Sequence, residues 1–532
     1  RAYGGRNLPV TQRIAVPNQQ AFLDRIRIYG WVGTPDHEID DAIDGLGANT
    51  PMSERQLCIF DTLREWTFTH EVDEGTNSWD SLLGGNTTQP SLCPNNARTC
   101  TKKEYLQGVF SGYTTQDGDP VYPATMIDFG MFRQGPGSSF ADAAEQFLGF
   151  GMIGAHRLEV LSGAARVTRN SEEGLYKIAT SDLAALEVRP GFARMGADMY
   201  FNGNLEPIMI LTPSGDQVWK SEAYSTTWQY WKFVWRSSLF LKVTVVDHLW
   251  TTHFSVGNAL AAASREALPA AHPLRRLLSI FTWGTIAVNK NAAHQLVGPK
   301  HLLHRSSPFS DFGHVSEVAQ ASIPSFQSSF GAFLDDSQFQ LLHQTVKDTP
   351  YIADGSLLFG ALKQLVDDWF GLFESDWCDV SDAVMDPALE AFIQRFEAWS
   401  MHQAHAATDN AWLGLRVDGT LRCNGLKRWL GVMLFAVTGY HRHVGTVADI
   451  AADPEFSTWS WKEGEAYGRP LQHLQMSLIA ASTAKIMPKI LNDFSHLAEG
   501  LSKQTEAVAT LQTFKQRMAS VAAEIDARNQ QR

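Results

Sequence analysis

The chain has 532 residues, of which 44% are hydrophobic and 19% are charged. This composition is typical of a globular protein with a large core, and it excludes an intrinsically disordered chain. The formal net charge of -13 argues against a general nucleic-acid binder. The longest apolar run, Trp429 to Tyr440, is too short for a membrane span. We therefore expect no nucleic-acid partner and no transmembrane segment.

Cysteines are sparse, and the absence of a Cys-x-x-Cys motif argues against a zinc ribbon or a thioredoxin-like site. Cys93 and Cys100 flank a short loop, and they either pair in an oxidising compartment or remain free thiols. The chain begins at Arg1 without a methionine, which fits a mature product that has lost a targeting segment, for example in an organelle, or a trimmed sequence. The compartment stays open.

The first part of the chain is rich in glycine, asparagine, aspartate and threonine, which predicts helices joined by long loops. Ser53–Glu71 is the clearest helix there, because its apolar residues recur at three-residue steps. A second helical region is predicted at Ala141–Leu161. It contains Gly149-x-Gly151-x-x-Gly154, but these glycines follow helix-forming residues rather than a strand, which argues against dinucleotide binding.

Residues Asp198 to Val218 have the pattern of β structure, with a hairpin turn at Asn202-Gly203. From Trp228 onward the hydrophobic periodicity predicts helices almost to the end of the chain. A short β-containing part followed by a long helical body predicts a single, mainly α domain over residues 1–532. The predicted helices are Trp228–Leu268, Pro273–Gln295, Leu357–Phe373, Pro387–Ala406, Leu426–His443, Leu471–Asn492 and Ser502–Asn529.

The most informative stretch runs from Phe240 to Leu278 and places His248 and His253 inside an apolar helix. Positions i and i+5 of an α-helix lie about 140° apart, so the two rings would face different directions. A π-type turn, closed by an i→i+5 hydrogen bond, would bring both rings onto one face, where they could share a metal ion. The alternative is a pair of packed core histidines without a metal.

Several segments around this pair resemble the lipoxygenases. The sequence His-Leu-Trp-Thr-Thr-His at His248–His253 is similar to the family's His-Trp-Leu-x-Thr-His, and His272–Leu278 is similar to its His-Pro-x-x-x-Leu-Leu helix start. The family's glycine-containing hairpin is matched by Asn202–Ile210, its Ala-Gly-x-Asn-Pro segment by Gln146–Leu161, and its last long helix by Thr513–Asn529. The resemblance is collinear from about Gly135 onward, although few residues are identical.

The resemblance implies a third metal ligand on a later helix, and the best match is His441. The family places an asparagine, or sometimes a histidine or serine, where this chain has Gly445. It also uses a terminal isoleucine carboxylate, which we expect to be lacking in a chain that ends at Arg532. His443 lies two residues from His441, so on a regular helix it points away from the shared centre.

The function that the resemblance implies is a non-haem iron dioxygenase that cycles between ferrous and ferric states. It would abstract a bis-allylic hydrogen from a polyunsaturated fatty acid and add O2. Residues 136–532 would form the recognisable helical body and 1–135 a divergent N-terminal region, without the family's N-terminal lipid-binding β-barrel. The substrate channel would be lined by Leu277 and Leu278 and by either Ala292 or Ala293, which lie near the family's stereochemical position.

A second interpretation belongs to a different class. Three features favour a catalytically degenerate lipoxygenase-like protein: Gly445, the presence of Arg442 and His443 in a place that is normally small and apolar, and the expected lack of a terminal carboxylate. Such a protein would serve as a structural or assembly subunit of a larger complex, with no iron bound. The three retained histidines favour the enzyme instead.

Overall fold

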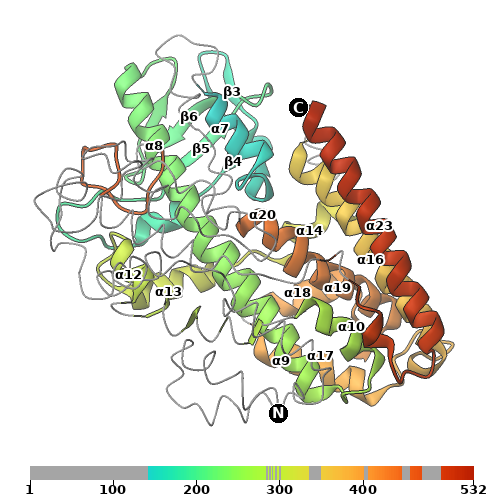
Figure 1. Ribbon diagram of the computed structural model, residues 1–532. Coiled ribbons are helices and arrows are strands. Elements are labelled where there is room, and N and C mark those ends of the chain that lie inside the picture. Colours follow the sequence, from blue (N-terminus) through green and yellow to red (C-terminus); the bar gives the residue numbers. More distant parts are fainter. Residues whose placement is uncertain are drawn as a thin grey trace, which may run out of the picture.

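The computed structural model describes six main stretches of the chain. Three features predicted from the sequence lie outside these stretches: the helix Ser53–Glu71, the cysteines Cys93 and Cys100, and most of the helix Leu471–Asn492. The described residues are 142–282, 301–334, 349–400, 405–445, 456–469 and 493–531, with single positions 285, 286, 289, 292, 293, 296–298 and 490 between them. Over these residues the fold is mainly helical, with a small sheet at the start (Figure 1). The fold class predicted from the sequence is therefore confirmed.

The sheet consists of antiparallel neighbours in the order β1-β4-β5-β6-β7. Its residues alternate between two faces, because Met199 and Phe201 join the main core while Tyr200 joins a smaller cluster with Trp219. The predicted hairpin at Asn202-Gly203 is present as β5 and β6. The strands are β1 (Leu158–Val160), β4 (Tyr176–Ile178), β5 (Asp198–Phe201), β6 (Pro207–Leu211) and β7 (Gln217–Trp219), with the separate pairs β2 (Val167–Arg169) and β3 (Glu172–Gly174), and β8 (Arg416–Val417) and β9 (Thr420–Leu421).

The predicted helical region before the sheet is helical only in its first half, so its second half was predicted wrongly. The chain turns at Gly154, where an added Cβ would lie 2.8 Å from the carbonyl oxygen of Leu148, so only glycine permits this approach. Gly149 packs closely against Ile178 of the sheet. The glycines thus serve the packing of a turn on a sheet. The elements are α7 (Ala143–Gln146), the π turn η5 (Phe147–Gly151) and the 3-10 turn η6 (Ala155–Arg157), followed by β1.

The centre of the molecule is one unbroken helical rod that corresponds to the predicted helix Trp228–Leu268. It begins beside the sheet and runs across the molecule to the far end, where it packs against α17 (Figure 1). The next helix, α10, begins at Pro273 and is capped by His272, whose Nδ1 accepts a hydrogen bond of 3.1 Å from the amide of Leu274. The rod comprises α8 (Ser225–Lys242), the π-helix η9 (Val243–Gly257) and α9 (Asn258–Ala267), and α10 spans Pro273–Phe281.

The second half of the chain packs around a long helix, α16, which contacts both α19 and α23. The last helix, α23, lies along α16 at the edge of the molecule (Figure 1). Asp311, Ser325 and Asp386 each cap a helix start with the side chain. The remaining helices are α12 (Leu302–Ser306), α13 (Phe312–Ala321), α14 (Phe326–Phe330), α16 (Pro350–Trp377), α17 (Pro387–Trp399), α18 (Ala406–Leu413), α19 (Cys423–Phe435), the π turn η12 (Ala436–Tyr440), α20 (His441–Gly445) and α23 (Gln504–Gln531).

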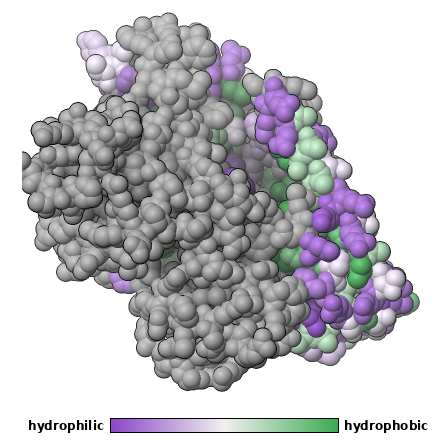
Figure 2. All heavy atoms as spheres, in the orientation of Figure 1, coloured by the Kyte–Doolittle hydropathy of each residue, from purple (hydrophilic) through white to green (hydrophobic). Residues whose placement is uncertain are grey.

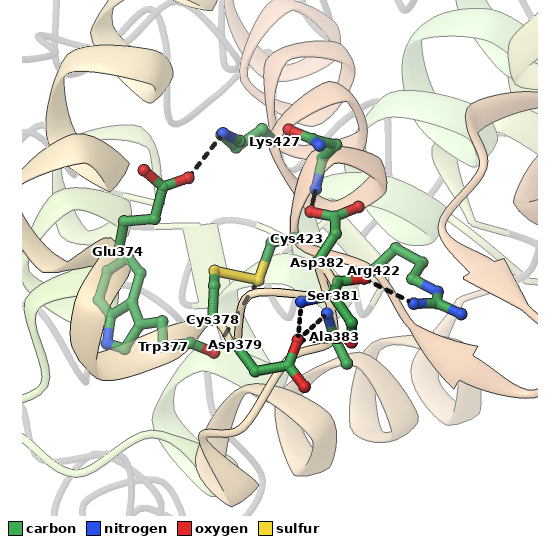
Figure 3. The surroundings of a disulfide bond; sticks show 11 residues. Glu374, Trp377, Cys378, Asp379, Ser381, Asp382, Ala383, Arg422, Cys423 and Lys427 are labelled. Carbon is green, nitrogen blue, oxygen red and sulfur yellow. Dashed lines mark hydrogen bonds and ion pairs between the residues drawn. A yellow bond between two sulfur atoms is a disulfide. The ribbon is translucent and has the colours of Figure 1, made fainter.

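A disulfide that the sequence pattern did not indicate joins Cys378 to Cys423, whose Cα atoms are 6.2 Å apart. It links the end of α16 to the start of α19 (Figure 3). The loop after Cys378 is ordered by Asp379, whose carboxylate accepts hydrogen bonds of 2.8 Å from the amides of Ser381 and Ala383. The bond therefore fixes the beginning of the helical run that carries His441 and ends at Gly445.

The outer surface near α23 is mainly hydrophilic, with apolar residues between the polar ones (Figure 2). α23 is held to α16 by ion pairs between Arg517 and Asp368 at 3.4 Å and between Arg528 and Asp354 at 3.2 Å. Among the helices that the structure describes, none combines the length and the apolar character that a bilayer crossing requires.

Candidate metal centre

The helix that carries His248 and His253 is a π-helix over all of Val243–Gly257, which confirms the predicted π-type turn and extends it. The Thr252 side chain shows the same five-residue spacing. Its hydroxyl donates a hydrogen bond of 2.8 Å to the carbonyl of Asp247, five residues earlier. The segment is rich in β-branched valine and threonine, which fit a regular α-helix less well than unbranched residues do. The wider turn brings the two imidazoles onto one face.

The third histidine, His441, arrives from the other half of the chain. It follows directly after another π turn, η12 (Ala436–Tyr440), which continues α19 without a break. η12 and α20 both pack against η9. Two widened helical segments therefore meet side by side and present His441 to the pair on η9.

The three Nε2 atoms form a nearly equilateral triangle. The separations are 3.1 Å between His248 and His441, 3.2 Å between His248 and His253, and 3.0 Å between His253 and His441. Two nitrogens about 2.1 Å from one first-row ion and at a right angle to each other lie about 3 Å apart. All three histidines are partly buried as residues. The spacing of their Nε2 atoms fits a shared ion.

The protonation of His253 is set by Asn289. The amide oxygen of Asn289 lies 2.8 Å from Nδ1 of His253, while the Asn289 Nδ2 donates to the His253 carbonyl at 2.6 Å. An amide oxygen only accepts hydrogen bonds, so His253 Nδ1 carries the proton and the Nε2 lone pair faces the other two rings. Asn289 thus acts as the outer partner that fixes a ligating tautomer.

Burial keeps the three imidazoles neutral. Desolvation lowers the pKa of His441 to about 3, with smaller contributions from His253 and Arg442. Desolvation likewise lowers the pKa of His248 well below the ordinary value and lowers that of His253. Neutral imidazole is the form that binds metal ions, so at neutral pH each of the three rings can offer a lone pair to a shared ion.

The residue before His248 anchors the π-helix. Asp247 is fully buried, and its carboxylate accepts two hydrogen bonds of 2.5 Å from Arg157 and one of 2.8 Å from Nε2 of His156. Burial raises the pKa of Asp247, but the attraction of Arg157 and His156 outweighs it, so the net shift lowers this pKa far below its ordinary value. η6 and η9 are therefore joined by a buried charge pair beside the triad.

His443 belongs to this second cluster and not to the triad. Its Nε2 lies 3.0 Å from Nδ1 of His156, and its ring lies 4.0 Å from that of Tyr351. Tyr440 completes the cluster with its ring against His156. As predicted from the helical spacing, His443 points away from the shared centre.

Gly445 ends α20 beside the triad. A Cβ added to Gly445 would lie 3.6 Å from Nε2 and 3.9 Å from Cε1 of His248. These are ordinary van der Waals distances, so a Cβ at this position would contact the His248 ring without a clash. Position 445 is thus adjacent to the triad in space, and this chain places no side chain there.

The four predicted channel residues differ in exposure. Leu277 and Leu278 are buried in the main core, Ala292 is partly buried against that core, and Ala293 is exposed. Of the two alanines, the position of Ala292 is the better one for a channel wall. Lining of a channel by these residues stays a prediction.

Sequence reasoning missed the partners that hold the triad: Asn289, Asp247, His156 and Arg157. Only a weak signal was available, namely that Arg157 lies in the segment that resembles the lipoxygenases and that Asp247 directly precedes His248. Their contacts join residues 36 to 91 positions apart, which no local pattern specifies.

The fold and the site define a mainly helical protein with a partly buried centre of three neutral histidines. The sequence matches no protein-family model. Three solved structures are similar over most of the chain: a coral 8R-lipoxygenase, a manganese lipoxygenase of Gaeumannomyces graminis and a fungal lipoxygenase from Fusarium graminearum. The chain therefore has a divergent lipoxygenase fold.

The similarity lies in the fold and hardly in the sequence. The coral structure is 14% identical with a TM-score of 0.62, and the match covers 91% of this chain and 73% of that one. The manganese lipoxygenase is 12% identical with a TM-score of 0.57 and coverages of 92% and 87%. The Fusarium structure is 12% identical with a TM-score of 0.55 and coverages of 88% and 86%.

Proposed function

We propose that the chain is a lipoxygenase-type dioxygenase that peroxidises polyunsaturated fatty acids with O2. The observation that carries this proposal is the convergence of the Nε2 atoms of His248, His253 and His441 within 3.0–3.2 Å of one another. The lipoxygenase fold supports it, because the solved structures that share this fold include a coral 8R-lipoxygenase and a manganese lipoxygenase.

In this proposal the three imidazoles hold a non-haem iron ion, which supplies one-electron redox chemistry when bound. Asn289 keeps the His253 lone pair directed at the ion through its hydrogen bond to Nδ1. Arg157 and His156 immobilise Asp247 and with it the turn of η9 that presents His248. The ligands are thus held in place before the ion arrives.

The apolar residues of α10 serve a different purpose. A bis-allylic chain needs an apolar channel that excludes bulk water and orients the reacting carbon. Leu277 and Leu278 are buried, and α10 packs against α9, which continues the π-helix. We assign these two leucines and Ala292 to the channel wall.

A second candidate function is a catalytically degenerate subunit of a larger assembly. The specific observation in its favour is Gly445, which offers no ligand atom beside His248. Retention of a third histidine, the neutral state of all three and the Asn289 clamp favour the enzyme.

Metal analysis of the purified protein tests the proposal directly. We expect about one equivalent of iron per chain, and manganese is the alternative ion, since one similar structure is a manganese lipoxygenase. Addition of linoleate or arachidonate should then form conjugated dienes. His253→Ala should abolish both, whereas His314→Ala, a control on α13 outside the triad, should leave both intact. A metal-free centre in a folded protein would favour the degenerate subunit.

A further inference from the structure

His156 connects the two helices that carry the candidate metal ligands, although it lies on the separate turn η6. Its side chain is 1% exposed, and each ring nitrogen has a partner on a different helix. We propose that His156 is a positioning residue that braces the helix of His248 against the helix of His441. The inference rests on the proposed metal centre and names the residue that sets the separation of two of its ligands.

The first arm of this brace reaches the helix of His248. Nε2 of His156 lies 2.8 Å from Oδ2 of Asp247, the residue directly before His248. Asp247 is also bound by Arg157, so its carboxylate has a fixed place. Because a carboxylate only accepts hydrogen bonds, Nε2 of His156 carries a proton and donates to Asp247.

The second arm reaches the helix of His441. Nδ1 of His156 lies 3.0 Å from Nε2 of His443, and in a neutral ring with its proton on Nε2 this Nδ1 accepts the hydrogen bond. The His156 ring also packs edge-on against His443 and against Tyr440, with ring centroids 5.1 Å and 5.2 Å apart. His156 therefore contacts this helix on both sides of His441 in the sequence.

The second arm fixes the direction in which His441 points. Residues two apart on an α-helix lie about 200° apart, so His443 and His441 project from opposite sides of α20. Apolar packing is non-directional, whereas the hydrogen bond to His443 sets the rotation of the helix about its axis. The Nε2 atoms of His248 and His441 thus stay 3.1 Å apart before an ion binds, which lowers the ordering cost of binding.

Two substitutions of His156 in the full chain each keep one arm. In His156→Gln, the amide nitrogen takes the place of Nε2 and donates to Asp247, but the bond to His443 is lost. In His156→Asn, the amide oxygen takes the place of Nδ1 and accepts from His443, but the bond to Asp247 is lost. We expect each variant to bind Co2+ about tenfold more weakly in competition with a chelator. The visible absorption of bound Co2+ should change as well, because it reports the coordination.

His443→Phe tests the other end of the second arm and keeps a ring against Tyr351. We expect the same loss of Co2+ affinity as in His156→Gln. The double variant should lose no more than either single variant, because both remove the same hydrogen bond. Unaltered Co2+ affinity in His156→Gln would mean that only the anchoring of Asp247 matters, and it would overturn the brace. Additive losses in the double variant would overturn it too.

His272→Gln is the matched control. His272 is another buried histidine with both ring nitrogens engaged, since Nδ1 accepts from the amide of Leu274 at 3.1 Å and Nε2 lies 3.0 Å from Oδ2 of Asp386. It caps α10 outside the triad, so its loss should lower the melting temperature without a change in Co2+ affinity or spectrum. An equal fall in Co2+ affinity would show that metal binding merely follows stability. Failure of the unaltered folded chain to bind Co2+ would overturn the proposed metal centre, and this inference with it.

Discussion

Asn289 holds His253 at two points: its amide oxygen lies 2.8 Å from the ring Nδ1, and its amide nitrogen donates to the His253 carbonyl at 2.6 Å. The second contact reaches a carbonyl of the π-helix, where the wider turn has rearranged the backbone hydrogen bonds. One side chain therefore fixes both the tautomer of a candidate ligand and the helix that carries it.

This clamp predicts a large effect of Asn289→Ala on metal binding. Loss of an outer-shell partner typically reduces metal affinity by about 10–100-fold, because the imidazole is no longer held in its ligating orientation. Competition with a chelator followed by metal analysis measures the change. Asn410→Ala, which removes a hydrogen bond of 2.8 Å to Glu397 away from the triad, should leave the affinity unaltered. Equal affinities in the two variants would contradict the role of Asn289.

Asp247 and Arg157 form a buried ion pair, so we expect the protein to lose stability when this pair is broken. Asp247→Asn removes the charge that compensates a guanidinium with little exposure, and breaking a buried pair costs about 3–5 kcal/mol of unfolding free energy. Denaturant unfolding measures it. The control is Asp367→Asn, whose exposed i,i+4 pair with Lys363 should contribute less than about 0.5 kcal/mol. Similar losses in both variants would mean that Asp247 is not the anchor described above.

The neutral histidines predict that the metal-free protein loses stability as the pH falls below about 6.5. Burial lowers the folded-state pKa of His248, His253, His441, His156 and His443, so in this window the unfolded chain binds more protons than the folded one. The pKa of Asp247 is also lowered in the folded protein. Because Asp247 is a carboxylate, its contribution to folding stability is lost only below about pH 4. Thermal unfolding at pH 7.5 to 4.5 is the measurement.

A bound metal ion should offset part of this loss of stability, because it binds the neutral imidazoles of the folded protein. The shift in melting temperature on addition of metal should persist as the pH falls below about 6.5, because the lowered pKa of the folded histidines keeps them neutral while protons bind the histidines of the unfolded chain. A melting temperature that stays constant from pH 7 to 5 without metal would contradict the buried neutral state.

Because a disulfide joins Cys378 to Cys423, we expect the protein to be less stable under reducing conditions. The bond closes a loop with a sequence separation of 45, for which chain entropy gives about 4 kcal/mol. Replacement of both cysteines by serine should lower the melting temperature and remove the effect of added reductant. The triad is held by other contacts, so chelator-competition affinity for metal should persist in the folded double variant. An unaltered melting temperature would show that the bond does not form in solution.

The sequence by itself determined the elements that follow from local periodicity. The long rod at Ser225–Ala267, the hairpin at Asn202-Gly203 and the helix that begins at Pro273 could all be predicted, because each depends on neighbours a few residues apart. The spacing of His248 and His253 also predicted the π geometry, since an α-helix cannot bring residues five apart onto one face.

Only the tertiary structure decided how the centre is held. Three contacts join residues that are far apart in the sequence: Asn289 with His253 (36 positions), Asp247 with Arg157 (90 positions) and Cys378 with Cys423 (45 positions). No periodic pattern in the sequence encodes such separations. The turn at Gly154 was likewise set by close packing on the sheet, which overrode the helical preference of the residues around it. Local propensity specifies which segments are helical, whereas the packing of distant segments fixes which side chains meet.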